Sequence, residues 1–191
     1  MKSQVLIVGA GPVGLTMAAE LARYGVSVRI VDKSTRRTDK SKAVVLWSRT
    51  LELLDRAGCT GAFVTLGNKV DAANIIADKT VIGHVNFSDV DSPYPFALML
   101  PQSDTERLLE EHLGRLGINT QRQTELSSFE QDESGIRAVV RNADGQEEVV
   151  KADWLIGCDG AHSAVRHGLG LSFLGNTLQS DWILADLHLG G

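Results

Sequence analysis

The first 32 residues alternate between apolar runs and helical periodicity in a way that predicts a strand, a helix and a second strand. Val5 to Val8 is a continuous apolar run that ends in glycine, which is typical of a strand buried on both faces of a parallel sheet. From Pro12 to Tyr24 the apolar residues recur at helical spacing, with a proline in the first turn and a glycine after the last. Val26 to Val31 is rich in β-branched residues and predicts the second strand.

Further along, the pattern predicts two more helices. Thr50 to Ala57 and Ser103 to Leu116 have helical spacing and end at glycines, and Glu106 lies three residues after Ser103, which fits a capping box. The segment 33–42 is polar with an excess of basic residues, so we interpret it as a solvated loop. Residues 63–100 combine β-formers with turn residues and predict short strands.

The C-terminal third has the pattern of antiparallel strands. Leu126 to Glu130, Ile136 to Arg141 and Glu147 to Lys151 are strand-like and are separated by turn residues, which predicts a meander. Trp154 to Ile156 is a further apolar run and predicts another strand, which ends close to Asp159. We therefore expect an α/β fold in which helices cover one face of a parallel sheet and the meander covers the other.

Composition narrows the class of protein. Hydrophobic residues make up 43% of the 191 residues and charged residues 23%, so a folded globule is expected rather than a disordered chain. A net charge of -5 argues against a nucleic-acid partner, which requires a clustered basic surface. The two cysteines, Cys59 and Cys158, favour a reducing, cytoplasmic setting. Glycines interrupt the N-terminal apolar run, so we expect no signal peptide and no membrane span.

Three glycines follow the first predicted strand at the spacing of a dinucleotide-binding turn. Gly9 can make a tight turn, Gly11 can let the backbone approach a pyrophosphate, and Gly14 can let the helix pack close to the sheet. Asp32 ends the second strand about 20 residues later, where a carboxylate binds a ribose hydroxyl and disfavours a 2′-phosphate. The alternative is a simple tight turn followed by a strand-end carboxylate. These residues alone do not separate NAD from FAD.

Four segments occur together in one protein family, and Cys158 to Arg166 is the most specific of them. The others are Gly9 to Gly14, Ser48 to Gly58, and Leu100 to Gln102 followed by Thr105, Glu106 and Leu109. In these segments the chain resembles the class A flavoprotein monooxygenases, the family of para-hydroxybenzoate hydroxylase, phenol hydroxylase and the hydroxylases of aromatic polyketides. The resemblance covers nearly the whole chain.

This resemblance implies cofactor contacts beyond the glycine turn. Gln102 would hydrogen-bond FAD along its ribityl and diphosphate region, and Arg49 or Lys42 would lie near the phosphates. Asp159 would contribute to binding the flavin and, through the neighbouring chain, to the approach of NAD(P)H. The complete set of predicted contacts to the cofactor is Gly9, Gly11, Pro12, Val13, Gly14, Asp32, Lys33, Lys42, Arg49, Gln102, Leu126 and Asp159.

The resemblance also implies a domain organisation and a function. Residues 1–175 would form a Rossmann-like FAD-binding domain of the two-dinucleotide-binding flavoprotein type. Residues 68–100 would be inserted strands on the substrate side, and 176–191 the first strand of a truncated, β-rich substrate domain. The implied function is the FAD-binding portion of a monooxygenase that uses NADH or NADPH and O2 to hydroxylate a small aromatic substrate. The family's second flavin motif, a late Gly-Asp pair, is absent, so we expect the chain alone to be inactive.

Two alternatives stay open at this point. One is a related flavoenzyme, such as a halogenase, an epoxidase or a Baeyer-Villiger type oxygenase. The other is a short, non-catalytic paralogue that binds ADP-containing ligands, or a partner through an exposed sheet edge. Catalytic residues are not assigned, and homo-oligomerisation stays open. No metal site is expected, because no two histidines have a spacing that would pair them as ligands: His84, His112, His162, His167 and His188.

Overall fold

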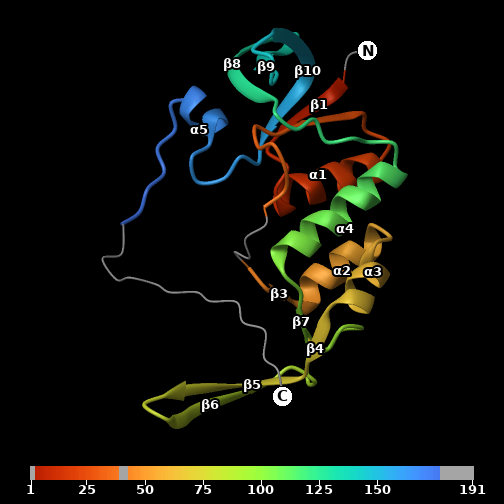
Figure 1. Cartoon of the computed structure of the whole chain (residues 1–191), viewed down its shortest axis with the longest axis vertical. Coiled ribbons are helices and arrows are strands. Elements are labelled where there is room, and N and C mark those ends of the chain that lie inside the picture. Colours follow the sequence, from red (N-terminus) through yellow and green to blue (C-terminus); the bar gives the residue numbers. More distant parts are fainter. Residues whose placement is uncertain (1–2, 39–42, 177–191) are drawn as a thin grey trace.

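A computed structural model describes residues 3–38 and 43–176 of the chain. Its centre is a five-stranded sheet in the order β2-β1-β10-β9-β8 (Figure 1). The two strands beside β1 run parallel to it, whereas β9 and β8 continue the sheet in antiparallel fashion. The five strands are β1 (Ser3–Val8), β2 (Val28–Val31), β8 (Glu125–Asp132), β9 (Gly135–Arg141) and β10 (Glu147–Gly157).

One long strand, β10, joins the parallel and antiparallel parts of the sheet. Its first half pairs with β9 and its second half pairs with β1, and Ala152 has a partner on both sides. The sequence pattern predicted two strands here, Glu147 to Lys151 and Trp154 to Ile156, and that division is wrong. The change from one partner to the other, rather than a turn, accounts for the change in the apolar pattern along β10.

Helices cover one face of the parallel part of the sheet. α1 (Pro12–Arg23) packs beside α4 (Gln102–Arg115), with α2 (Ser48–Arg56) and α3 (Thr60–Leu66) next to them (Figure 1). Their apolar side chains form one buried cluster with alternate residues of the parallel strands. The cluster includes Val5, Ile7, Leu15, Ile30, Leu51, Phe63, Leu98, Leu109 and Leu113.

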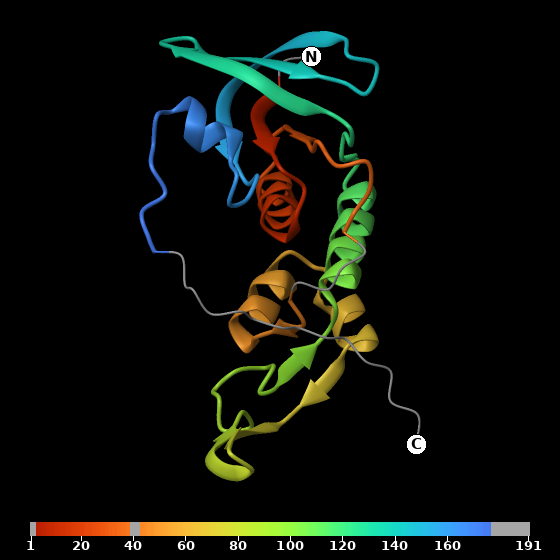
Figure 2. The same cartoon turned by 60° about the vertical axis from the view of Figure 1, so that its left-hand side comes forward.

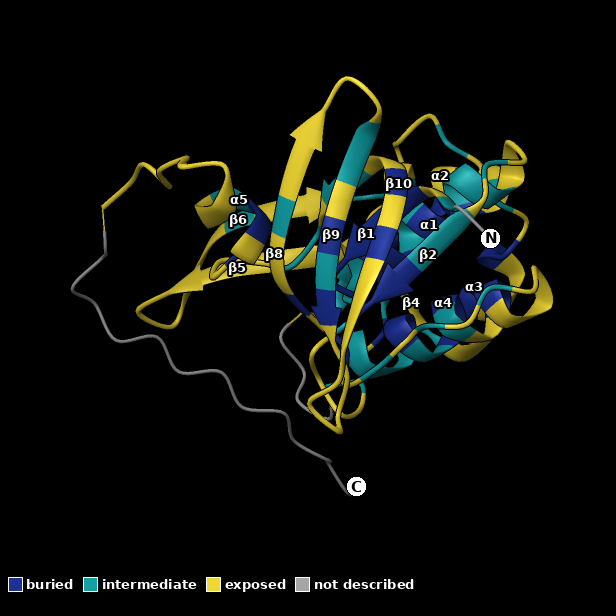
Figure 3. Cartoon of the chain, turned by 90° about the horizontal axis from the view of Figure 1, so that it is seen from above, coloured by how far each residue is buried: buried dark blue, intermediate teal, exposed yellow. Residues whose placement is uncertain are grey.

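A second buried cluster lies on the opposite face of the parallel strands. Leu6 and Val8 alternate with Ile7 along β1, so they point away from the helices. They form a second buried cluster with residues of the meander, and the short helix α5 (Ala164–Gly168) contributes Val165 to it. Figure 3 shows buried residues along β1 and in part of β10. The predicted α/β fold with a parallel sheet, helices on one face and an antiparallel meander is confirmed, but the meander strands continue the same five-stranded sheet instead of forming a separate layer.

A smaller second part of the molecule lies beyond α2 and α3 (Figure 2). It contains a three-stranded sheet in the order β3-β7-β4 and a separate hairpin of β5 and β6, whose Ile75, Ile76 and Ile82 are exposed. The strands are β3 (Val45–Leu46), β4 (Asn68–Val70), β5 (Ala72–Ala77), β6 (Thr80–Asn86) and β7 (Ala97–Met99). The short strands predicted for residues 63–100 are present, but residues 63–66 are helical, because α3 buries Phe63 completely.

The predicted capping box at the start of α4 is not formed. The helix begins at Gln102 after Pro101, without a side-chain cap, and Glu106 bonds to other groups described below. The strand predicted for residues 176–191 lies almost wholly outside the described residues. In the part of the chain that is described, no helix is both long enough and apolar enough to cross a lipid bilayer.

Candidate functional site

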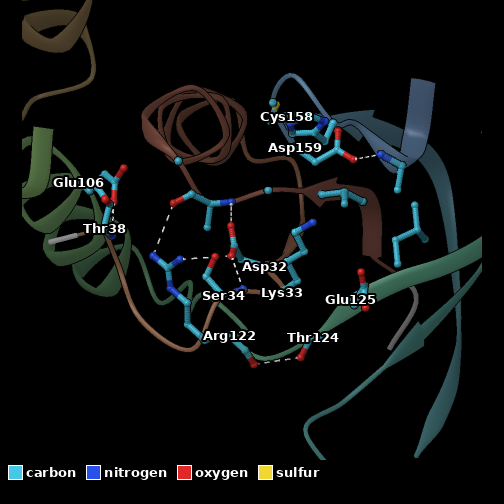
Figure 4. A pocket seen from close by; sticks show the side chains of 18 of the residues that line it. Asp32, Lys33, Ser34, Thr38, Glu106, Arg122, Thr124, Glu125, Cys158 and Asp159 are labelled. Atoms are coloured by element: carbon cyan, nitrogen blue, oxygen red, sulfur yellow. Dashed lines mark hydrogen bonds and ion pairs between the residues drawn. The ribbon is translucent and has the colours of Figure 1, made fainter. Parts of the chain in front are cut away.

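A groove of about 260 Å³ opens at the carboxyl ends of β1 and β2 (Figure 4). This is the edge of a parallel sheet at which α/β proteins bind ligands. The groove lies at the end of β1, which has a parallel neighbour on each side. The volume is near the lower end of the range for small-molecule sites, which suits part of a dinucleotide. Its lining comes from the β1–α1 turn, the segment after β2, the start of α4, the segment leading into β8 and the turn after β10.

Each glycine of the β1–α1 turn has its own structural reason. Gly9 has a φ of +101°, and a side chain there would collide with the carbonyl of Cys158 at the end of β10. A side chain at Gly14 would collide with the carbonyl of Gly9, so the helix can approach the strand only with glycine there. At Gly11, by contrast, an added Cβ would meet no atom within 4 Å. Gly11 lines the groove, so a side chain at this position would find open space beside it.

The N-terminus of α1 begins beside the groove, at Gly11. Gly11 is the N-cap residue, and neither a capping side chain nor an acidic residue in the first turn satisfies the N–H groups of the helix. Such an end combines free N–H groups with the positive end of the helix dipole. A phosphate can therefore bind there without a basic side chain.

Asp32 lies at the end of β2, as predicted, and its carboxylate supports the glycine turn. One oxygen accepts a hydrogen bond from the backbone N–H of Ala10 at 2.6 Å, and the other accepts from the N–H of Ser34 at 2.7 Å. The side chain is 13% exposed and lines the groove. A carboxylate has about four acceptor sites, so Asp32 retains capacity for a ligand hydroxyl.

Arg122 contributes to the site and was missed by the sequence analysis. Its guanidinium lies 3.5 Å from the Asp32 carboxylate and donates to Glu110 at 2.5 Å and to the Ala10 carbonyl at 3.5 Å (Figure 4). The segment before β8 reaches this place because Gln121 forms a parallel bridge with Val31 at the end of β2. No local pattern marks Arg122, because its partners are far away in the sequence.

Gln102 and Glu106 form the wall of the groove at the start of α4. The amide Nε2 of Gln102 donates to Glu106 Oε1 at 2.8 Å, and the backbone N–H of Thr38 donates to Glu106 Oε2 at 3.4 Å. Glu106 is only 4% exposed. The backbone N–H of Gln102 is held by the Ala43 carbonyl at 2.9 Å. The predicted contact residue Gln102 is therefore fixed at both its main chain and its side chain.

Asp159 also lines the groove, and its carboxylate organises the turn after β10. It accepts hydrogen bonds from the Ser163 hydroxyl at 2.5 Å and from the backbone N–H groups of Ala164 at 2.6 Å and Val165 at 3.3 Å. These bonds hold the first turn of α5, where the Ser163 hydroxyl in turn accepts from Arg166. Asp159 thus fixes the course of the chain along one side of the groove.

The structure brings most, but not all, of the predicted contacts together. Lys33 and the buried Leu126 line the groove with Gly9, Gly11, Asp32, Gln102 and Asp159. Pro12, Val13 and Gly14 do not line the groove, and Val13 is 67% exposed. Arg49 lies at the start of α2, pairs with Glu52 at 2.8 Å and does not line the groove. Lys42 lies outside the described residues. Lining residues that were not predicted include Ser34, Arg36, Thr38, Glu106, Arg122, Thr124, Glu125 and His162.

The one thiol in the lining is not an activated nucleophile. Burial, with a smaller effect from the Asp159 charge, raises the pKa of Cys158 above its ordinary value of 9.0, so the thiol is protonated at neutral pH. Among the described residues, His, Cys, Asp and Glu side chains form no group of three or more that could hold a metal ion. The lining therefore offers hydrogen bonds and a phosphate-binding helix end.

Comparison with known proteins gives consistent matches along the chain. A family model described as FAD binding domain matches residues 2–189. The chain is 38% identical to 6-methylpretetramide 4-monooxygenase from Streptomyces rimosus, with 97% of this chain and 33% of the relative covered. It is 33% identical to pentachlorophenol 4-monooxygenase from Sphingobium chlorophenolicum, with 93% of this chain and 33% of the relative covered. The chain thus spans about a third of the length of these two relatives.

A solved structure supports the same similarity. The crystal structure of p-nitrophenol 4-monooxygenase from Pseudomonas putida DLL-E4 superposes with a TM-score of 0.87 at 26% sequence identity. The match covers 93% of this chain and 46% of that one. The architecture described above is therefore that of the N-terminal part of a larger flavin-dependent enzyme fold.

Proposed function

This chain belongs to the FAD-binding domain family, and from that premise we propose that it is the FAD-binding portion of a monooxygenase that hydroxylates a small aromatic substrate. The observation that carries the proposal is the meeting of three features in one groove. These are the free space at Gly11, the uncapped N-terminus of α1 and the carboxylate of Asp32. Together they fit an adenosine diphosphate group: a pyrophosphate on the helix end and a ribose on the carboxylate.

In this proposal each part of FAD has its own residues. Asp32 accepts a hydrogen bond from the ribose, the N–H groups at the start of α1 bind the pyrophosphate, and Gln102 bonds to the middle of the cofactor. Lys33 and Leu126 line the same groove, and Asp159 fixes the chain beside it. Lys42 and Arg49 stay predictions from the family pattern. We also propose that residues 68–100, which supply β4, β7 and the β5–β6 hairpin, belong to the substrate side.

FAD, when bound, would carry electrons from NADH or NADPH and activate O2 so that one oxygen atom is added to the aromatic ring. The residues of this chain bind and orient the cofactor. Asp32 would repel the 2′-phosphate of NADPH, and NADH would have to compete with the adenosine half of FAD for the same groove. We therefore propose that the reductant binds elsewhere. The aromatic class of substrate is supported by the relative named for pentachlorophenol.

Titration of the chain with FAD, ADP and NAD tests the proposal. Isothermal calorimetry gives each affinity, and the change in flavin fluorescence reports FAD independently. We expect ADP and FAD to bind to the same site, so that saturating ADP displaces the adenosine half of FAD. Absence of binding by both ligands, or binding of FAD that ADP does not weaken, would contradict the assignment of this groove.

A further inference from the structure

We propose that Glu106 is a positioning residue that orients the Gln102 amide, so that the Gln102 carbonyl oxygen accepts a hydrogen bond from a ribityl hydroxyl of FAD. The inference rests on the proposed FAD site and deepens it. It assigns a role to a buried acid that the family resemblance left unassigned, and it decides which part of the cofactor Gln102 contacts.

Burial and hydrogen bonding both point to this role. Glu106 is 4% exposed and lies one helical turn after Gln102 on α4. Its two oxygens each accept from an N–H group, one from the Gln102 side chain at 2.8 Å and one from the Thr38 backbone at 3.4 Å. Glu106 therefore joins α4 to the segment that follows β2, across one end of the groove.

The chemistry of the pair fixes which way the amide faces. An ionised carboxylate can only accept hydrogen bonds, so the side of the amide that meets Glu106 has to be its NH2 group. The oxygen and nitrogen of a glutamine amide are told apart by such a network. With the NH2 group held by Glu106, the carbonyl oxygen of Gln102 is the atom presented to a ligand in the groove.

That orientation selects between the two parts of FAD near Gln102. The ribityl chain carries hydroxyl groups that can donate to a carbonyl oxygen. The diphosphate carries only acceptor oxygens, which a carbonyl oxygen repels. Gln102 should therefore recognise the ribityl chain, which FAD has and ADP lacks. The contribution of Glu106 to binding should accordingly appear with FAD and be nearly absent with ADP.

The test compares Glu106→Gln with the unaltered chain, using calorimetric affinities for FAD and for ADP. The isosteric amide cannot accept from both Gln102 and Thr38, so one of the two N–H groups loses its acceptor and the Gln102 amide is no longer fixed. We expect FAD affinity to fall about three- to tenfold, the effect of one neutral hydrogen bond, with ADP affinity changed less than about twofold. Glu111→Gln is the matched control, because Glu111 lies on the same helix, pairs with Arg107 and does not line the groove.

A double variant separates positioning from a general structural effect. In a Gln102→Ala background, Glu106→Gln should cause no further loss of FAD affinity if Glu106 acts through Gln102. The inference would be overturned if Glu106→Gln reduced FAD affinity in that background as much as it does in the unaltered chain. It would also be overturned if Glu106→Gln alone reduced ADP and FAD affinity equally. Either result would leave the proposed FAD site standing. Failure of the unaltered chain to bind either ligand would overturn the proposed function and the inference together.

Discussion

Replacing Asp32 with alanine should weaken the binding of adenosine diphosphate more than any other single change at the carboxyl end of β2. The carboxylate is mostly buried, and both of its oxygens already hold backbone N–H groups of the turns on either side. A ligand hydroxyl would add a charge-assisted hydrogen bond worth roughly 1.5 to 3 kcal/mol. The dissociation constant of ADP should therefore rise by roughly ten- to a hundredfold in the variant.

The same substitution also removes the acceptors for Ala10 and Ser34, so a loss of affinity has two sources. Comparison of ADP with 2′-deoxy-ADP separates them, because only ADP has the hydroxyl that Asp32 is expected to bind. In the unaltered chain ADP should bind more tightly than the deoxy ligand, and in Asp32→Ala the two should bind equally. Loosening of the turn alone would weaken both ligands and preserve their ratio.

A charged control completes the experiment. Asp144→Ala removes an exposed acid from the turn between β9 and β10, outside the groove, and should leave both affinities unchanged. Asp32→Ala should also reduce the preference for ADP-ribose over 2′-phospho-ADP-ribose, because the repelling carboxylate is gone. Unchanged ADP affinity in Asp32→Ala would refute the assignment of the ribose to this residue.

Three further predictions test other parts of the site and the fold. Gly14→Ala should lower the free energy of unfolding, measured with urea, by about 1 to 3 kcal/mol because of the clash with the Gly9 carbonyl. Gly11→Ala should leave the free energy of unfolding nearly unchanged and weaken ADP binding, measured by calorimetry, about tenfold or more. Unchanged ADP affinity in Gly11→Ala would show that the turn faces away from the ligand. Arg122→Met should lower the free energy of unfolding, measured with urea, by about 1 to 3 kcal/mol, since it removes the cation shared by Glu110 and Asp32. Arg122→Lys should recover only part of this loss. An unchanged free energy of unfolding in Arg122→Met would show that the pairing does not stabilise the site. Burial, and secondarily the charge of Arg115, lowers the pKa of His112 below its ordinary value of 6.5. As the pH falls, the unfolded chain therefore takes up the proton first, so the stability contributed by the neutral histidine should be complete above about pH 6.5 and fall below it. The fall in the free energy of unfolding, measured with urea from about pH 7.5 to about pH 5.5, should be smaller in His112→Gln.

The sequence was most informative where structure is determined locally. Periodicity and turn residues predict the strand, helix and strand of the first 32 residues, the helices α2 and α4, and the meander strands β8 and β9 to within about two positions of their observed ends. The glycine turn was also predictable, since the positive φ of Gly9 and the close approach of Gly14 to the Gly9 carbonyl belong to the strand-to-helix turn itself. Asp32 followed from its place at the end of a strand.

What the sequence did not predict depends on contacts between distant residues. Arg122 reaches the site only because Gln121 pairs beside Val31, and Glu106 turns into the groove rather than back to Ser103 because Gln102 and Thr38 supply its partners. The continuous strand β10 was divided in two, because a strand with different partners along its length has no single period. Family resemblance supplied Gln102 and Asp159, whose local sequence resembles an ordinary helix start and an ordinary turn.

The position of β1 between β2 and β10 has a consequence for the order of folding. β2 follows β1 within 31 residues, but β10 is not available until residue 157 has been synthesised, so the pairing that closes the sheet has a high contact order. During synthesis on the ribosome, the glycine turn would therefore exist without the Cys158 carbonyl against which Gly9 packs until residue 158 has been added. A nucleotide that binds only after β1 and β10 have paired would favour this pairing by mass action. The cellular concentration of the cofactor would then set the yield of native chain.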